Sequence, residues 1–254
     1  MLLVVVGLFG LAVGSFLNVV VHRLPRGESL LRPGSHCPHC RVKVRPWHNV
    51  PVLSWLLLRG RCAGCGRWIS ARYPLVELGT GLLYVAIAAR FGPSPALPAY
   101  LYLAAVGIAL ALIDAAIQRL PNAIVLPSYL VGALLLVPAG LDGLLRGLVA
   151  MAVLWTFYFA LSMVYPGGMG FGDVKLAGLL GLYLGWLGWS SVLVGTLAGC
   201  LLGGFAGVAL VLTRRASAKT AIPFGPYMLA GALLALFAAA PIAAWYASFL
   251  IPQT

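Results

Sequence analysis

Charged residues are scarce in this chain. Asp, Glu, Lys and Arg make up 9% of its 254 residues, whereas soluble globular domains contain about 25%. Hydrophobic residues account for 62% of the chain. This composition excludes a soluble globular protein and predicts an integral membrane protein.

Long apolar segments are expected from that composition, because a membrane-spanning helix needs about 20 mainly apolar residues. The sequence contains eight candidates, at residues 2–21, 74–91, 98–116, 122–139, 147–165, 174–188, 190–212 and 226–250. The first begins with M-L-L-V-V-V and no basic residue, so we expect a retained helix rather than a cleaved signal peptide. The predicted fold is an all-α polytopic membrane protein with about eight transmembrane helices.

Acidic residues are the rarest charged class: the chain has five, against 17 Lys and Arg residues, and its formal net charge is +12. A strong positive charge can indicate nucleic-acid binding. If the N-terminus lies outside, however, the cytoplasmic segments 22–73, 117–121, 166–175 and 213–221 contain 15 of the 17 basic residues. The positive-inside rule favours this orientation. Orientation in a lipid bilayer therefore accounts for the positive charge of the chain, and we expect no nucleic-acid partner.

Residues 22–73 form the one sizeable polar segment, and they contain two C-x-x-C pairs, Cys37 with Cys40 and Cys62 with Cys65. Two such pairs can present four thiolates to one tetrahedral zinc ion. In the reducing cytosol disulfides are the poorer explanation. Four sulfur ligands leave no position for a catalytic water, so the sequence predicts a cytoplasmic zinc-ribbon-like loop with a structural zinc ion. Redox-active or free thiols are the alternative.

The glycine-rich stretch P-G-G-M-G-F-G-D-V-K-L, residues 166–176, places Asp173 and Lys175 between two apolar segments. Its glycines, Gly170 and Gly172 among them, allow a non-helical turn and the close approach of another chain. Irregular backbone at this depth requires surrounding protein or a water-filled cavity. We therefore expect Asp173 to face a cavity. The alternative is an interfacial aspartate that caps the next helix while Lys175 extends to the membrane surface.

Three of the five acidic residues, Glu77, Asp114 and Asp173, are predicted inside the helix bundle near its cytoplasmic face. A carboxylate near the middle of a membrane costs at least ~2.5 kcal/mol, so a functional reason is expected. Two adjacent aspartates can share one proton: the ionised one takes a proton from water while the protonated one polarises a peptide carbonyl. A proton or cation relay would use the same pair. Glu77 could instead pair with Arg72 or another basic group of the loop.

Five motifs in order resemble the prepilin peptidase family, also called the type IV leader peptidases. They are G-S-F-L-N-V-V-V-H-R-L-P at 14–25, the cysteine loop through I-S-A-R-Y-P-L-V-E at 37–77, I-D-A-A-I-Q-R-L-P at 113–121, G-M-G-F-G-D-V-K-L at 168–176 and I-P-F-G-P-Y at 222–227. Together they span nearly the whole chain.

The resemblance implies a Gly-x-Gly-Asp membrane aspartic protease of the bacterial cytoplasmic membrane, with Asp114 and Asp173 as its catalytic pair. It implies type IV prepilin or pseudopilin substrates, which carry a short basic leader in the cytosol and are cleaved after a glycine at the membrane face. Support of the site or of substrate binding is expected from four further residues. These are Gly170, Gly172, Lys175 and Glu77.

Many family members also methylate the new N-terminus with S-adenosylmethionine. Here the segment from Arg26 to Cys37 is shorter than in the well-known members with both activities, and no glycine-rich nucleotide motif is evident. The sequence therefore leaves methylation and this cofactor open. A second departure is Asn122, where some members carry an aspartate.

The main alternative function is a proton- or cation-coupled transporter that uses Asp114, Asp173 and Glu77. A third is a noncatalytic scaffold that docks partners through the zinc loop. An inverted repeat would favour transport, and the sequence has no clear internal repeat. The expected organisation is a first transmembrane helix at 1–21, a cytoplasmic zinc loop at 22–73 and a helix bundle with the protease site at 74–254. The oligomeric state does not follow from the sequence.

Overall fold

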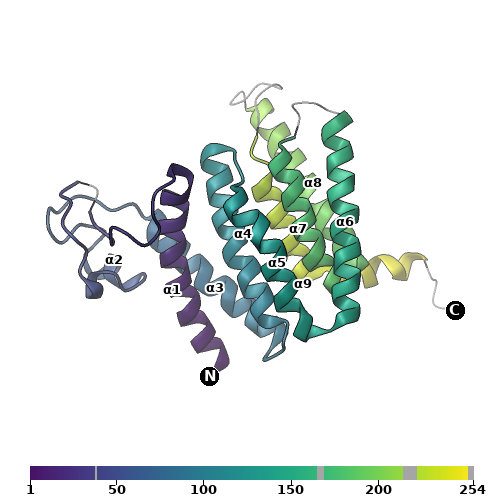
Figure 1. Ribbon diagram of the computed structural model, residues 1–254, viewed down its shortest axis with the longest axis horizontal. Helices are drawn as coiled ribbons and strands as arrows, with labels where there is room; N and C mark the ends of the chain where they lie inside the picture. Colours follow the sequence, from purple (N-terminus) through teal and green to yellow (C-terminus); the bar gives the residue numbers. More distant parts are fainter. Residues whose placement is uncertain (38, 165–168, 214–221, 251–254) are drawn as a thin grey trace. The chain divides into compact units, whose positions relative to one another are not determined.

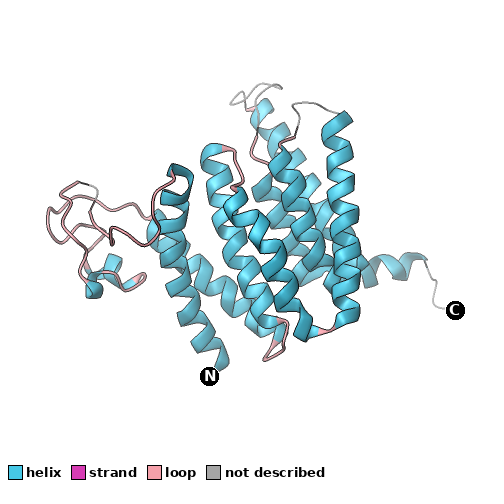
Figure 2. Ribbon diagram, viewed as in Figure 1, coloured by secondary structure: helices cyan, strands magenta, loops and turns pink. Residues whose placement is uncertain are grey.

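The computed structural model describes residues 1–37, 39–164, 169–213 and 222–250. Within these ranges the chain is helical apart from its loops, and the longest loop joins α1 to α3 (Figures 1 and 2). The long helices are α1 (Leu2–Arg23), α3 (Arg72–Phe91), α4 (Leu97–Ile117), α5 (Asn122–Leu136), α6 (Leu141–Val164), α7 (Phe171–Leu187), α8 (Trp189–Leu212) and α9 (Gly225–Leu250). The short ones are α2 (Leu53–Leu57), η1 (Leu24–Arg26), η2 (Pro46–His48) and η3 (Val137–Ala139).

Each of the eight predicted apolar segments overlaps one of the long helices, so the predicted all-helical fold is confirmed. Seven of these helices are long and apolar enough to cross a membrane. The exception is α7, whose 17 residues extend over about 26 Å at 1.5 Å per residue. Parts of the predicted segments 166–176 and 213–221, including Gly167, Gly168 and Arg214, lie outside the described residues.

The predicted start of α6 is wrong by six residues, because the helix begins at Leu141 rather than at residue 147. Asp142 lies exposed in the first turn of α6. Arg146 lies in the same helix, where its guanidinium donates to the carbonyls of Gly185 and Trp186 at 2.7 and 2.6 Å. These carbonyls end α7 and have no partners in their own helix, so the arginine charge is compensated and does not interrupt α6.

Contacts within the chain divide it into two compact units, residues 1–109 and 110–254, and the boundary falls inside α4. In the first unit α1 packs along α3. A Cβ atom on Gly14 would lie 2.7 Å from the Cα of Glu77, so the two helices approach closely at that point. The side chain of Asn18 donates to the carbonyl of Tyr73 at 3.1 Å, which fixes the start of α3 against α1.

In the second unit α6 packs on α7, and α8 packs on α9. Glycines recur every four residues along α8, a spacing that predicts a close-packed face. The structure confirms that face at two positions. A Cβ atom on Gly195 would lie 3.2 Å from the Cβ of Ala235, and one on Gly199 would lie 3.2 Å from the Cα of Met228.

Candidate active site

Asp114 lies one turn before the end of α4 and is 4% exposed. Its Oδ2 accepts a hydrogen bond of 3.0 Å from the main-chain N–H of Gly225, the first residue of α9. N–H groups in a first helical turn have no partner within their helix. The positive end of the α9 dipole therefore faces this carboxylate. The motif I-P-F-G-P-Y thus contributes a donor to Asp114, a role that the sequence did not reveal.

Asp173 is the third residue of α7 and is 9% exposed. Its Oδ2 accepts from the N–H of Gly170, the N-cap residue, at 3.2 Å. This contact is the carboxylate half of a capping box. The capping interpretation of Asp173 therefore holds. The side chain is at the same time buried by the surrounding protein.

The two aspartates are neighbours in the second unit. Asp114 lies close enough to Asp173 for the two charges to interact. Each accepts a main-chain hydrogen bond at a helix N-terminus, Asp173 at that of α7 and Asp114 at that of α9. Two carboxylates whose charges interact are an arrangement that can hold one proton between them while one member stays charged. That is the protonation state which acid–base hydrolysis requires.

Segment 120–129 holds the first turns of α7 in place. Lys175 Nζ donates to the Asn122 side chain at 2.8 Å and lies 4.7 Å from the centre of the Phe171 ring. The hydroxyl of Tyr129 donates to the main-chain carbonyl of Lys175 at 2.5 Å. A Cβ atom on Gly172 would lie 3.1 Å from the Cβ of Leu120, so a glycine allows this approach. Lys175 therefore bonds to the start of α5.

Asn122 and Tyr129 are supporting residues that the sequence analysis did not identify. In the sequence, Asn122 stands out only as a departure from the family pattern. Its position directly after the Leu-Pro pair, at the start of α5, is the signal that could have suggested a capping or bridging role.

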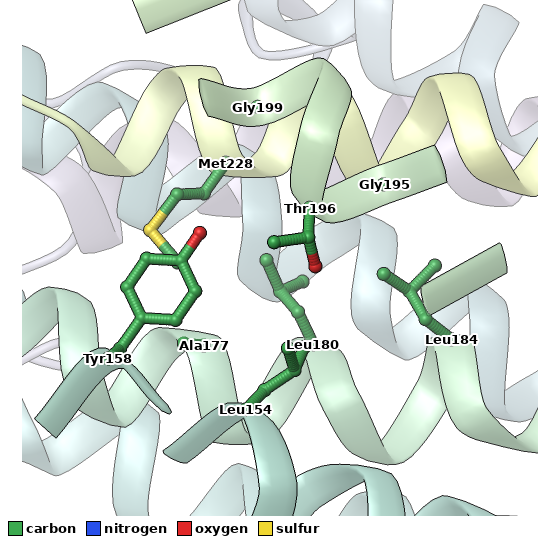
Figure 3. Close-up of a pocket in the computed structure, with 9 residues that line it drawn as sticks. All are labelled: Leu154, Tyr158, Ala177, Leu180, Leu184, Gly195, Thr196, Gly199 and Met228. Atoms are coloured by element: carbon green, nitrogen blue, oxygen red, sulfur yellow. The ribbon is translucent and has the colours of Figure 1, made fainter. Parts of the chain in front are cut away.

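A small cavity lies deeper in the same unit, between α6, α7, α8 and α9 (Figure 3). Its walls are mainly apolar, with Tyr158 and Met228 on one side and Leu184 on the other (Figure 3). Its volume of ≈ 10 Å³ is about that needed to hold one water molecule. The Tyr158 hydroxyl lies 3.8 Å from the Cys200 sulfur and within range of the Asp173 charge. At the volume given above, the cavity is far too small to hold a peptide or a nucleoside.

Glu77 belongs to the first unit, where its partner is a main-chain group of the loop. Its Oε2 accepts from the N–H of Val52 at 2.7 Å. Val52 has φ 61, a conformation that β-branched residues rarely adopt. The bond joins the start of α2 to α3, so Glu77 positions the loop. The expected pairing with Arg72 or another basic group is replaced by this contact.

The four loop cysteines come together as predicted. Their sulfur atoms all lie within 4.8 Å of one another, and Cys37 to Cys65 and Cys40 to Cys62 both measure 3.9 Å. Four sulfurs at about 2.3 Å from a tetrahedral zinc ion would be about 3.8 Å apart, so the cluster fits zinc.

Both knuckles have the same main-chain hydrogen bonds. The N–H of Cys37 donates to Val42 O and that of Cys62 to Arg67 O, each five residues ahead. Arg41 and Gly66, each four residues after its cysteine, have positive φ angles of 57 and 68.

The environment of Cys37 favours the form that binds metals. Hydrogen bonds from the main-chain N–H groups of Cys40 and His39 lower the pKa of Cys37 to about 6. The thiolate is the state in which cysteine coordinates metal ions. The donor set and the thiolate character of Cys37 thus suit a zinc ion.

These features define a multi-pass membrane protein with a buried aspartate pair and a separate four-cysteine loop. Residues 8–91 match the bacterial peptidase A24 N-terminal domain, and residues 101–208 match the type IV leader peptidase family. The chain belongs to the type IV leader peptidase family and is accordingly a protease.

Several curated relatives support that assignment over almost their full length, and each is named a prepilin leader peptidase/N-methyltransferase. The relative from Aeromonas hydrophila is 39% identical over 268 residues, which cover 94% of this chain and 91% of the relative. The relative from Pseudomonas putida is 41% identical over 247 residues, with 86% and 84% covered. The relative from Pseudomonas aeruginosa is 38% identical over 270 residues, with 95% and 92% covered. No solved structure is significantly similar to this chain.

Proposed function

We propose that this protein is a membrane-embedded aspartic endopeptidase that removes the short basic leader from type IV prepilins or pseudopilins. The observation that carries the proposal is the buried pair Asp114 and Asp173, each held by a helix N-terminal N–H and close enough for their charges to interact. The substrate class is supported by the names of the relatives, which are prepilin leader peptidases.

In the proposed reaction the ionised aspartate takes a proton from a water molecule as its oxygen attacks the scissile carbonyl carbon. The protonated aspartate donates a hydrogen bond to the carbonyl oxygen and stabilises the charge that develops there. That proton, or the one taken from water, then passes to the leaving amine. Gly170 supports the reaction by leaving space beside the Asp173 carboxylate, Gly172 by letting α7 approach Leu120, and Lys175 by holding α7.

We further propose that cleavage takes place at the cytoplasmic face of a bacterial inner membrane, with the N-terminus outside. The distribution of basic residues supports this orientation through the positive-inside rule. Both aspartates lie near helix ends, where a water-soluble leader can reach them. The proposed division of labour is a first helix at 1–21, a zinc loop at 22–73 and a bundle at 74–254 that carries the protease site.

The cysteine cluster is proposed to hold one structural zinc ion. When bound, zinc would link the two knuckles and stabilise a loop too small to form its own apolar core. Cys37, Cys40, Cys62 and Cys65 would be the ligands.

Methylation of the new N-terminus is the second proposed activity, and the observation that favours it is the N-methyltransferase part of the relatives' names. Its methyl donor would be S-adenosylmethionine. The cavity in Figure 3 is too small for that cofactor, so the cavity is not assigned to methylation.

The test is cleavage of a full-length prepilin by the purified protein in detergent. We expect cleavage by the parent protein and a loss of about 100-fold or more in Asp114→Asn and in Asp173→Asn, because each variant removes one acid–base partner. As a control for folding, each variant should match the parent protein in zinc content and in thermal unfolding. Because detergent abolishes ion gradients, cleavage there also separates the protease from the transporter alternative. Cleavage at the parent rate by Asp173→Asn would refute the proposal.

A further inference from the structure

The helix α2 exposes its leucines and buries its serine, which is the reverse of the pattern expected for a loop in water. Leu53, Leu56 and Leu57 are 58, 58 and 82% exposed, whereas Ser54 is buried. The indole N–H of Trp55 donates to the carbonyl of Ile69 at 3.0 Å, so this side chain turns toward the loop. The leucines are therefore left on the outside.

Two neighbouring side chains continue the apolar surface. Ser54 Oγ donates to the carbonyl of Trp47 at 3.0 Å and accepts from the N–H of Val50 at 2.9 Å, which fastens η2 to α2. Trp47 and Val50 are themselves exposed. We call the surface formed by five residues the α2 surface: Trp47, Val50, Leu53, Leu56 and Leu57. Five exposed apolar side chains on one short segment indicate an interaction site.

Glu77 determines the level at which this surface lies. The residue is five positions into α3, which is about 7.5 Å along the helix axis. Its bond to the N–H of Val52 therefore holds the start of α2 beside the first turns of a membrane-spanning helix. In Figure 1, α2 accordingly lies beside the α1–α3 pair and lower in the view than the end of α1 where the loop begins. In a bilayer spanned by α3, this is the level at which the boundary between headgroups and acyl chains is expected.

The charges around the α2 surface are positive. The guanidinium of Arg45 lies 5.7 Å from the centre of the Trp47 ring, and Arg59 follows α2 directly. Between residues 24 and 71 the loop contains eight Lys and Arg residues and one acidic residue, Glu28. Basic residues beside an apolar face complement the phosphates of an anionic lipid surface.

We propose that the α2 surface is a membrane-interface anchor. Its leucines and Trp47 insert at the headgroup–acyl boundary of an anionic bilayer, while Arg45 and Arg59 lie among the lipid phosphates. The anchor holds the four-cysteine loop flat on the membrane beside the α1–α3 pair. This inference does not depend on the proposed protease reaction.

The test uses the full-length protein in nanodiscs of phosphatidylglycerol and phosphatidylcholine, with a solvent-sensitive fluorescent amino acid in place of Leu57. The matched control carries the same amino acid in place of Leu31, which is 84% exposed in the same loop but outside the α2 surface. Lipids brominated in their acyl chains should quench the label at 57 by about two-fold or more, and the label at 31 much less, because an interfacial helix buries its apolar face in that region.

Two variants test the origin of the quenching. Glu77→Ala should weaken it at position 57, because the start of α2 is no longer held beside α3. Arg45→Gln with Arg59→Gln should abolish the difference between nanodiscs with and without phosphatidylglycerol. Equal zinc content in all samples ensures that the loop is folded.

Three results would overturn the proposal. A blue-shifted label at 57 that bromine does not quench would mean that protein, either another part of this chain or a second copy, covers the surface. Water-like emission at 57 would mean that the surface is free in solution. Quenching independent of Glu77 and of both arginines would remove the structural basis of the anchor.

Discussion

In residues 1–109 the Glu77 carboxylate accepts a hydrogen bond from the N–H of Val52, and in residues 110–254 Asp114 and Asp173 accept theirs from Gly225 and Gly170. The bonds are of one kind, but their donors differ. Val52 is the N-cap residue of the five-residue helix α2 inside the loop, so the bond to Glu77 joins the loop to α3. Gly225 and Gly170 lie at helix N-termini, so their bonds place charge at positive helix ends.

The two units also differ in how they hold their polar groups in place. The loop of the first unit contains two knuckles whose cysteines approach to 3.9 Å, and a metal ion can supply the cohesion that a small core cannot. The aspartates of the second unit are held by close helix packing at glycines. The difference between the units is that the Glu77 carboxylate stands alone and joins two segments, whereas Asp114 and Asp173 each have a second carboxylate within electrostatic range.

Removal of the metal should have the largest effect, and it should be confined to the loop. A structural zinc site of this kind contributes about 10 kcal/mol to folding, so chelation or Cys62→Ser should expose residues 37–65 to proteolysis while the helices stay resistant. Mass spectrometry of the fragments, together with zinc content, measures this. Cys200→Ser, in α8, is the matched control and should keep its zinc. A loop that stays resistant without metal would contradict the structural role.

Gly225→Ala should have the next largest effect, this time on the aspartate pair. The added Cβ would lie 2.8 Å from Asp114 Oδ2 and must displace that carboxylate. Because a displacement of about 1 Å in a catalytic group can cost about 100-fold, kcat for prepilin cleavage should fall by roughly that factor. Gly204→Ala is the control, since its Cβ would meet no atom within 4 Å. An equal loss in both variants would point to general destabilisation.

Glu77→Ala should loosen the loop, because the Val52 N–H then has no carboxylate acceptor. Loss of such a bond costs about 1–3 kcal/mol, so amide exchange should accelerate at residues 50–55. Glu77→Gln keeps an acceptor oxygen and should protect these amides better. Its cleavage rate should also fall far less than that of either aspartate variant. If Glu77→Gln reduced cleavage as much as Asp114→Asn does, Glu77 would take part in the reaction. The proposed difference between the two units would then be wrong.

The smallest effect is expected where α5 holds α7. Lys175→Met removes the hydrogen bond to Asn122 and the cation–π contact with Phe171, and a bond of this kind contributes about 1 kcal/mol. Cleavage should fall several-fold. Asn122→Leu should cause a similar loss, and the double variant should be no worse than either single one, since the two residues share one interaction. Additive losses would show that they act separately.

Much of the fold followed from local sequence. Eight apolar segments predicted eight long helices because spanning length and hydropathy are properties of a single segment. The start of α6 was misplaced because Arg146 looked like a loop residue, and its partners, the carbonyls of Gly185 and Trp186, are about 40 residues away in sequence. Similarly, the C-x-x-C spacing predicted the metal cluster, whereas the Glu77 to Val52 contact had no local signal.

The sequence by itself determined that this is a helical membrane protein, that four cysteines form one cluster, and that acidic residues are rare enough for each to require a reason. These properties reside in composition and short spacings. Only the tertiary structure decided which carboxylates share a site and which one holds the loop. The physical reason is that the partner of each of these carboxylates is a main-chain N–H. Every residue except proline carries that group, so the residue type does not reveal the partner. Only the fold brings Gly225 to Asp114 and Val52 to Glu77.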